Sequence, residues 1–534
     1  MDVSELMDFL HYIFSFNSES PLLFTQFYFW AFFAVVYAGF ALIMEFGSKQ
    51  GKTAKARLHM RNVFLMLVSW FFYYKTSGQA LAILAFVTCS DWIIAQQIYR
   101  TNSTQKHWAA NLWLLLSVLI DLSFLCYFKY AYFGVDVVNS ICGTHFSIVD
   151  KIILPVGISF YTFQVISYTT DVYRGKVQPV KNLLDFGFYV SFFPQLVAGP
   201  IVRASEFIPQ LYKPFFLGRR QFGIAVFWIL NGLMKKIILS DYLAVNLIDR
   251  VFDNPLLFTG FENLFALFAY SLQVYADFSG YTDIAIGVAM LMGFYLPKNF
   301  DSPYKSRNPQ EFWRRWHQSL SRWLKGYVYI PLGGNRTLLG FKTGKLLASN
   351  VNSFLTMLIG GLWHGASWNF VIWGGLNGVG MIISKSWAAL KQRLGITDFI
   401  GKRRILSKVE DVVAIVLTFT FITFTRLFFR SGSNLDPATQ NEVAWRTAKQ
   451  MMGQIVGAWN SAIIPDFLRE YHVVVILFVL GMIIHWLPAH FKRWYRLNFA
   501  MMPLWLMAIC VTMAVFVAYQ FITADMQPFI YFQF

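Results

Sequence analysis

The chain has 534 residues, of which 56% are hydrophobic, 19% are aromatic and only 14% are charged. Soluble domains carry about 25% charged residues, so this composition excludes an ordinary soluble protein. The formal net charge is +17, but the basic residues gather in short segments between apolar runs, which argues for membrane topology and against a nucleic-acid partner. The four cysteines have no CxxC spacing, so we expect neither a disulfide framework nor a metal site.

Five apolar runs are long enough, or nearly long enough, to cross a membrane. They comprise residues 27–44, 112–128, 412–429, 473–487 and 501–522. A hydrocarbon core of about 30 Å takes roughly 20 helical residues to cross. Because backbone groups in lipid must pair within the chain, we expect these spans to be helices. The sequence therefore predicts an all-α polytopic integral membrane protein.

The charges between the runs predict an orientation. Residues 1–20 contain four acidic residues and no Lys or Arg, whereas residues 49–61 contain five Lys or Arg and no acid. By the positive-inside rule, the N-terminus is extracytoplasmic and the segment 49–61 is cytoplasmic. The same rule places 391–408 and 492–496 inside, and it places 430–470 and the C-terminus outside. Basic segments of this kind also attract anionic membrane lipids.

The middle of the chain predicts broken helices. Residues 152–200 are apolar but contain proline or glycine at 155, 157, 194, 199 and 200. Such breaks at membrane depth are tolerated where the backbone lines a cavity or is buried in protein. We therefore expect one domain over 1–534 with about ten to thirteen membrane-embedded helices, some broken or re-entrant, around a funnel or tunnel open to both sides. We also expect an external loop at 431–470 with a short amphipathic helix near 443–456.

The segment "EFWRRWHQSL" (311–320) contains a histidine among aromatic and basic residues. On a single helix over 312–327, aromatic and basic side chains separate into opposite arcs, which is typical of a helix lying at the membrane interface. The aromatic arc contains Trp313 and Trp316, and the basic arc contains Arg314 and Arg315. His317 lies at the edge of the apolar arc. It is either an interfacial histidine that is hydrogen-bonded to a neighbour or a functional residue.

A basic surface around this segment suits a phosphate-bearing ligand. Residues 298–345 carry ten Lys or Arg against Asp301 and Glu311. A solvated cytoplasmic face explains this excess, and so does a binding surface for a donor such as coenzyme A.

A second histidine stands in "GGLWHGASWNFVIWGG" (360–375), between the apolar segments 346–363 and 368–389. Lysines flank both segments on their outer ends, so we expect a hairpin that enters from the cytoplasm and returns to it, with His364 near its turn. Ionisable residues at such depth are candidates for function, and imidazole suits proton transfer near neutral pH. A buried histidine held by one hydrogen bond is the alternative. The glycines permit close helix packing or a narrow channel.

Long motifs in this chain resemble the membrane-bound O-acyltransferase superfamily, and more closely its bacterial branch of alginate and peptidoglycan O-acetyltransferases. They are "YADFSGYTDIAIGVAMLMGFYLPKNFDSPYKSRNPQEFWRRWHQSLSRWLKGYVYIPLGGNR", "GLWHGASWNF", "LPVGISFYTFQVISYTTDVYRG", "FFPQLVAGPIVR" and the terminal "PFIYFQF". The family core covers about 150–390, and C-terminal helices follow at 411–534. The resemblance implies that His364 is catalytic and that His317 is a second active-site residue. This chain departs from the family at Lys325-Gly326, where many members have Asp after the basic residue, and at Asn377, where many have histidine.

The resemblance also implies a reaction. An acetyl group would pass from cytoplasmic acetyl-CoA to a hydroxyl acceptor outside, for O-acetylation of a polysaccharide, through an extracytoplasmic acetyltransferase partner and from the inner membrane of a bacterium. We expect His364 to be the general base, with oxyanion donors from His317, Asn369 or the backbone near Gly360 and Gly361. Residues expected to contact substrates are Trp313, Trp316, Arg314, Arg315, Trp363, Asn369 and Asn377.

Other functions remain open from the residues. Within the enzyme class, the acceptor of the acyl or D-alanyl group is a lipid or teichoic acid in the alternative interpretation. Broken helices and buried polar groups also fit a lipid or glycan transporter, although transporters often show a repeat that this chain lacks. An inert scaffold explains the two histidines poorly.

Overall fold

The computed structural model describes residues 15–16, 22–45, 51–148, 152–338, 340–433, 439–522 and 528–530. The α-helices are α2 (Phe27–Glu45), α3 (Gly51–Ser77), α4 (Leu81–Ser103), α5 (His107–Leu125), α6 (Ala131–Cys142), α7 (Ile158–Tyr173), α8 (Leu183–Ser191), α9 (Phe193–Leu196), α10 (Ala204–Leu211), α11 (Arg219–Met234), α12 (Asp249–Asp253), α13 (Gly260–Leu291), α14 (Pro309–Arg315), α15 (Gln318–Leu324), α16 (Lys345–His364), α17 (Trp368–Arg393), α18 (Ile396–Gly401), α19 (Arg404–Ser431), α20 (Gln440–Gly457), α21 (Ile464–Glu470), α22 (His472–Trp486), α23 (Ala489–Met501) and α24 (Leu504–Gln520).

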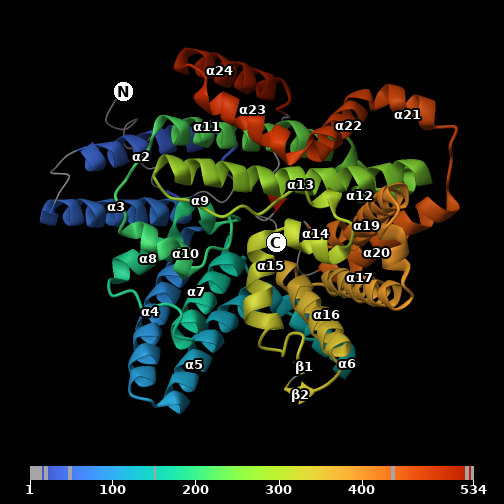
Figure 1. Ribbon diagram of the computed structural model, residues 1–534. Coiled ribbons are helices and arrows are strands. Elements are labelled where there is room, and N and C mark those ends of the chain that lie inside the picture. Colours follow the sequence, from blue (N-terminus) through green and yellow to red (C-terminus); the bar gives the residue numbers. More distant parts are fainter. Residues whose placement is uncertain are drawn as a thin grey trace.

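Shorter elements join these helices. Single turns of 3₁₀-helix lie at Gly78–Ala80, Pro255–Leu257 and Pro303–Lys305, and π-helical turns lie at Cys126–Tyr130, Lys235–Asp241, Ala244–Ile248 and Lys325–Tyr329. The strands β1 (Thr337–Leu338) and β2 (Phe341–Lys342) form a small antiparallel pair. In Figure 1, α14 and α15 lie near the middle of the molecule, and the longer helices surround them.

Six segments of the described chain are long and apolar enough to span a membrane, or up to eight if two bent helix pairs each count as one span. The spans expected at 27–44, 112–128, 412–429 and 473–487 are confirmed as helices. The last expected span begins later, because α23 and α24 meet at a bend of 118°. The larger expected number of embedded helices includes short segments such as α7, α8 and α9, which do not meet this length test. The all-α polytopic membrane fold is confirmed.

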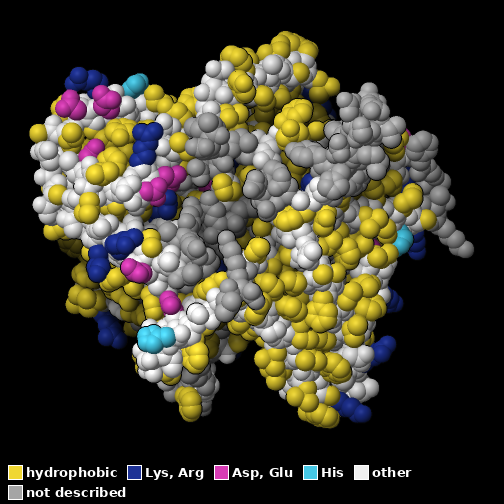
Figure 2. Space-filling model, turned by 180° about the vertical axis from the view of Figure 1, so that it is seen from behind, with side chains coloured by type: hydrophobic (Ala, Val, Ile, Leu, Met, Phe, Trp, Pro, Cys, Tyr) yellow, Lys and Arg dark blue, Asp and Glu magenta, His cyan; other side chains and the backbone are white. Residues whose placement is uncertain are grey.

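The surface suits a lipid environment. Large apolar side chains are exposed along the outer helices, for instance Trp505, Met513 and Phe516 of α24. Hydrophobic side chains cover much of the face in Figure 2, and the Lys and Arg side chains lie mainly on its left part and along its lower right edge. This distribution is typical of a protein whose apolar belt faces lipid and whose charges face water. The orientation expected for the two termini stays a prediction, because residues 1–14 and 531–534 lie outside the described residues.

The proline- and glycine-rich segment 152–200 is broken, as expected. Gly157 precedes α7 with φ +78°, and a Cβ on it would lie 2.6 Å from the carbonyl oxygen of Leu196. This turn therefore requires glycine. Every described side chain of α9 is buried, so the broken backbone is covered by protein. The expected amphipathic helix near 443–456 is α20, and its buried residues (Ala444, Ala448 and Met451) show that it packs onto the bundle.

Candidate active site

His364 is the last residue of α16, and α17 begins four residues later at Trp368. The two helices pack closely because glycine lies at their contact: a Cβ on Gly361 would lie 2.4 Å from the carbonyl oxygen of Phe370. The His364 side chain is only 3% exposed. The expected hairpin with a histidine at its turn is confirmed, and close packing explains its central glycines.

His317 stands in an irregular turn between α14 and α15. Its backbone has φ +42° and ψ +57°, a left-handed conformation that costs roughly 1–2 kcal/mol for a residue with a Cβ. Asn299 stabilises the turn from a neighbouring segment. Its carbonyl oxygen accepts from the Gln318 N–H at 3.0 Å, and its Oδ1 accepts from the Ser319 N–H at 3.1 Å. Backbone strain of this kind is frequent at functional sites.

The single amphipathic helix expected over 312–327 is therefore wrong. The chain forms two short helices with a break at residues 316 and 317, because the hydrogen bonds to Asn299 replace helical ones. The aromatic side chains also face protein and not lipid headgroups: Trp313, Trp316 and Trp323 are 8%, 4% and 5% exposed. Helical periodicity identified the buried face, but it could not reveal the break.

The fold brings the two histidines together. The centroids of the His317 and His364 rings are 6.4 Å apart. Trp363 contacts both rings, with centroid distances of 4.9 Å to His364 and 5.8 Å to His317. Phe278 lies edge-on to His317 at 4.6 Å, and Trp373 lies edge-on to His364 at 5.0 Å. Aromatic walls therefore shield both imidazoles from water.

Burial sets the charge state of the first ring. His317 is fully buried and lies outside the candidate spans, and this burial lowers the pKa of its imidazole to about 3. The ring is therefore neutral at pH 7 in the folded protein. The basic side chains of Lys129 and Arg426 lie near His364 and belong to two other helical segments.

Lys129 is a residue that sequence reasoning missed. It lies in the π-helical turn after α5 and is buried. Its Nζ donates to the carbonyl oxygen of Trp363 at 2.6 Å and to that of His364 at 3.2 Å. The neighbouring Tyr130 hydroxyl donates to the carbonyl oxygen of Leu362. These bonds satisfy carbonyl groups that the end of α16 leaves without helical partners. A lysine at the end of an apolar run is the signal that could have revealed it.

Arg426 is the second missed residue. It lies on α19 and is only 5% exposed. Its Cζ lies 4.2 Å from the centroid of Trp316, which is a cation–π contact. Phe429, one turn further along α19, contacts the His364 ring at 5.2 Å. A charged residue inside the apolar run 412–429 is a signal of the same kind.

The other residues predicted for substrate contact divide into two groups. Trp363 contacts both histidine rings, as described above. Trp313 and Trp316 are buried, where Trp313 contacts Trp373 at 5.6 Å and Trp316 lies under Arg426. The two asparagines hold helices together: the Asn369 Nδ2 donates to the carbonyl oxygen of Ala444 at 3.2 Å, and the Asn377 Nδ2 donates to that of Trp373 at 2.8 Å. Their roles in substrate binding stay predictions.

The basic pair of the "WRRWH" segment lies away from the histidine rings. Arg314 is exposed. Arg315 forms an ion pair with Glu311 at 2.8 Å and lies 3.8 Å from Asp301. Half-exposed ion pairs of this kind contribute little to stability. Both guanidinium groups remain on the polar side of α14, where the contact with a phosphate-bearing donor stays a prediction.

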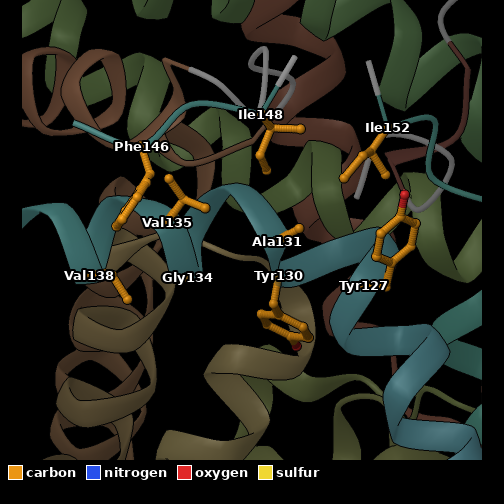
Figure 3. A pocket seen from close by; sticks show the side chains of 9 residues that line it. All are labelled: Tyr127, Tyr130, Ala131, Gly134, Val135, Val138, Phe146, Ile148 and Ile152. Atoms are coloured by element: carbon orange, nitrogen blue, oxygen red, sulfur yellow. The ribbon is translucent and has the colours of Figure 1, made fainter. Parts of the chain in front are cut away.

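Two cavities flank this region. A small one is lined by Lys129, Ser159, Trp363 and His364, together with Pro155, Gly157, Ile158 and Phe160. A larger apolar groove of about 620 Å³ lies along α6 and residues Phe146, Ile148 and Ile152 (Figure 3). Tyr130 points to the opposite side of α6 from the two isoleucines (Figure 3), toward the hairpin. A passage that connects both sides of the membrane stays a prediction.

The described residues contain no group of three or more His, Cys, Asp or Glu that could hold a metal ion. The chemistry that the site can perform with its own side chains is proton transfer by imidazole. The aromatic side chains around the histidines exclude water, and this strengthens the interactions between charged groups in the site.

Comparison with known proteins agrees with this geometry. The model of the MBOAT, membrane-bound O-acyltransferase family matches residues 100–425. A "Probable alginate O-acetylase" of Pseudomonas aeruginosa is 40% identical over 406 residues, which cover 75% of this chain and 71% of that protein. The "Peptidoglycan O-acetyltransferase" of Helicobacter pylori is 34% identical over 440 residues, which cover 78% and 77%. The "Teichoic acid D-alanyltransferase" of Streptococcus thermophilus is 28% identical over 332 residues, which cover 60% and 74%.

The family match spans more than half of the chain and includes both histidines and Lys129. It favours an enzyme over the transporter and the scaffold. This chain belongs to the membrane-bound O-acyltransferase family, and it is an acyltransferase.

Proposed function

We propose that this enzyme transfers an acetyl group from cytoplasmic acetyl-CoA to a hydroxyl acceptor on the other side of the membrane, for O-acetylation of a polysaccharide. The observation that carries the proposal is the meeting of two buried imidazoles, 6.4 Å apart, at the turn of a hairpin. Similarity to alginate and peptidoglycan O-acetyltransferases supports acetyl as the group and a polysaccharide as the final acceptor.

His364 acts as the general base in this proposal. A hydroxyl is a weak nucleophile until a base takes its proton during attack, and a general base near neutral pH typically contributes about 10²–10⁴-fold to the rate. His317 is neutral because burial lowers its pKa to about 3. It packs beside His364 and keeps that ring in place together with Trp363.

The donor and the acceptor approach from opposite faces. Basic residues of the segment 298–345 support donor binding on the cytoplasmic side, because coenzyme A carries phosphates. The enzyme sits in the inner membrane of a bacterium with both termini outside, following the positive-inside rule. An extracytoplasmic acetyltransferase partner receives the acetyl group and passes it to the polymer.

A comparison of cell-envelope glycans with and without the gene tests the acceptor. Mass analysis is expected to show the loss of O-acetyl esters from one polysaccharide in the deletion strain and their return with the wild-type gene. Return with the His364→Ala gene would refute the assigned base. Loss of D-alanyl esters or of an acylated lipid, with O-acetylation intact, would refute the polysaccharide and favour the alternative acceptor.

A further inference from the structure

Acyl transfer passes through a tetrahedral intermediate whose oxyanion needs hydrogen-bond donors. Two of the three sources of oxyanion donors expected from the sequence, Asn369 and the backbone near Gly360 and Gly361, are engaged elsewhere. The Asn369 amide donates to the carbonyl oxygen of Ala444, and Gly360 and Gly361 lie inside α16, where backbone N–H groups bond within the helix. The oxyanion site therefore has to be sought among other groups beside His364.

The small cavity beside His364 gathers such groups. It is lined by the His364 side of the hairpin, by Lys129 and by the first residues of α7. Its volume is about 10 Å³, which is roughly the space of one water molecule. A space of that size accommodates one oxygen atom and excludes bulk water.

Lys129 brings its amino group to this cavity. Among the residues that the structure describes, no Asp or Glu forms an ion pair with it. Its Nζ instead contacts three neutral oxygens, the third being the Ser159 Oγ at 3.3 Å. A buried cation without a counter-ion is costly, and its retention at membrane depth indicates a function. The π-helical turn that carries it is itself a feature frequent at functional sites.

Ser159 links this charge to the cavity. Its hydroxyl accepts from Lys129, and within the described part of the chain no acceptor takes its own proton. Ser159 is the second residue of α7, so its backbone N–H belongs to the first turn of that helix, where N–H groups lack helical partners. The N-terminal end of a 16-residue helix also contributes partial positive charge. The Trp363 Nε1 donates to the Ser159 carbonyl oxygen at 3.2 Å and fixes α7 against the catalytic hairpin.

We propose that this cavity is the oxyanion site of the acyl transfer, with the Ser159 hydroxyl donating to the acyl oxygen and the Lys129 ammonium stabilising its negative charge. The inference rests on the proposed function and adds two catalytic residues to it. The ligand group is the carbonyl oxygen of the donor thioester.

The step balances with the groups named. The acceptor oxygen forms a bond to the thioester carbon, its proton passes to His364, and the carbonyl electron pair moves onto the oxygen beside Ser159. When the intermediate collapses, that pair returns to form the carbonyl, the carbon–sulfur bond breaks, and the sulfur takes the proton from His364 and leaves as the thiol of coenzyme A.

Lys129 also holds the end of α16, so the experiment has to separate its charge from that structural role. Lys129→Gln removes the charge but keeps amide protons that can bond to the carbonyl groups of Trp363 and His364. Tyr130→Phe is the matched control, because it removes a hydrogen bond to the same helix end and leaves the charge. Ser159→Ala removes the proposed donor, and Ser159→Thr keeps a hydroxyl.

The measurement is single-turnover acetyl transfer by the full chain in lipid nanodiscs, with acetyl-CoA as donor, together with thermal unfolding and acetyl-CoA binding. We expect Lys129→Gln and Ser159→Ala each to lower the rate about 10²–10³-fold, the cost of losing an oxyanion donor, with acetyl-CoA affinity little changed. Tyr130→Phe and Ser159→Thr are expected to remain within about tenfold of wild type.

Two results would overturn the inference. One is a rate for Ser159→Ala within threefold of wild type, and the other is an equal loss for Tyr130→Phe and Lys129→Gln, which would reduce Lys129 to a helix cap. If Lys129→Gln does not fold, Ser159→Ala still decides the matter. Failure of the proposed function is distinguishable, because it would show as full transfer by His364→Ala.

Discussion

The two histidines reach the same aromatic pocket by opposite means. His364 ends a regular helix in a hairpin whose close packing depends on glycine at the helix contact. His317 stands in a left-handed turn that a remote asparagine holds in place. The hairpin is stabilised by repetitive packing, whereas the turn is stabilised by two specific hydrogen bonds to Asn299. The site therefore combines a rigid half with a strained half, and substitutions should affect the two halves differently.

The largest expected effect is on the rate and belongs to the hairpin. His364→Ala should lower acetyl transfer by about 10²–10⁴-fold, the usual contribution of a general base, with normal membrane insertion. His317→Asn should lower it less, because asparagine tolerates the left-handed backbone and only ring contacts are lost. Initial rates of purified variants, corrected for folded protein, measure both. A greater loss of rate for His317→Asn than for His364→Ala would indicate that His317, and not His364, is the general base.

The next effect is on the stability of the turn. Asn299→Ala removes the acceptor of the Ser319 N–H and leaves a buried donor unsatisfied, which costs about 1–3 kcal/mol. Asn299→Asp keeps an acceptor oxygen at that position and is the matched control. Chemical unfolding in detergent, followed by tryptophan fluorescence, compares the two. Equal stability of wild type and Asn299→Ala would show that the turn does not depend on this contact.

A third effect tests the packing of the hairpin. A Cβ on Gly361 would lie 2.4 Å from the carbonyl oxygen of Phe370, whereas a Cβ on Gly375 would lie 3.6 Å from a Leu358 side-chain atom. Gly361→Ala should therefore cost about 1–3 kcal/mol through overpacking, and Gly375→Ala should be nearly neutral. Thermal unfolding of both variants measures the difference. If Gly361→Ala is as stable as Gly375→Ala, then α16 and α17 can move apart at this contact without loss of stability.

The smallest effect is a pH dependence of stability from the strained half. Burial lowers the pKa of His317 to about 3 from its ordinary value of 6.5. Below pH 6.5 the unfolded chain therefore binds a proton that the folded chain does not. The free energy of unfolding then decreases as the pH is lowered, by up to about 1.4 kcal/mol per pH unit. His317→Asn should reduce this slope between pH 6.5 and 5. An unchanged slope would contradict the burial of a neutral ring.

The two halves also differ in how far the sequence predicts them. The hairpin follows from local patterns, since two apolar segments flank a short turn and lysines mark their ends. The break at His317 does not follow from local patterns, because it depends on hydrogen bonds to Asn299. Asn299 lies outside the segment 312–327, and nothing in the sequence around it indicates this role. Periodicity correctly grouped the aromatic side chains of 312–327 on one face. That face is buried in protein, whereas the expected position was at the lipid headgroups.

The missed residues have a related explanation. Lys129 and Arg426 each lie in or beside an apolar run that was interpreted as a span, and a single charge does not disturb such a pattern. Their partners come from other helices: Lys129 contacts carbonyl groups of Trp363 and His364, and Arg426 lies over Trp316. Contacts of this kind become visible only when the helices are placed in space.

The most direct test of the account is transfer across a sealed membrane. Proteoliposomes would hold the enzyme with its partner and the polysaccharide acceptor inside, and radiolabelled acetyl-CoA would be added outside, to the enzyme's cytoplasmic face. The account predicts acetyl esters on the enclosed acceptor with the wild type and none with His364→Ala, while the vesicles remain impermeable to coenzyme A. Labelled acceptor with the His364→Ala enzyme would contradict it.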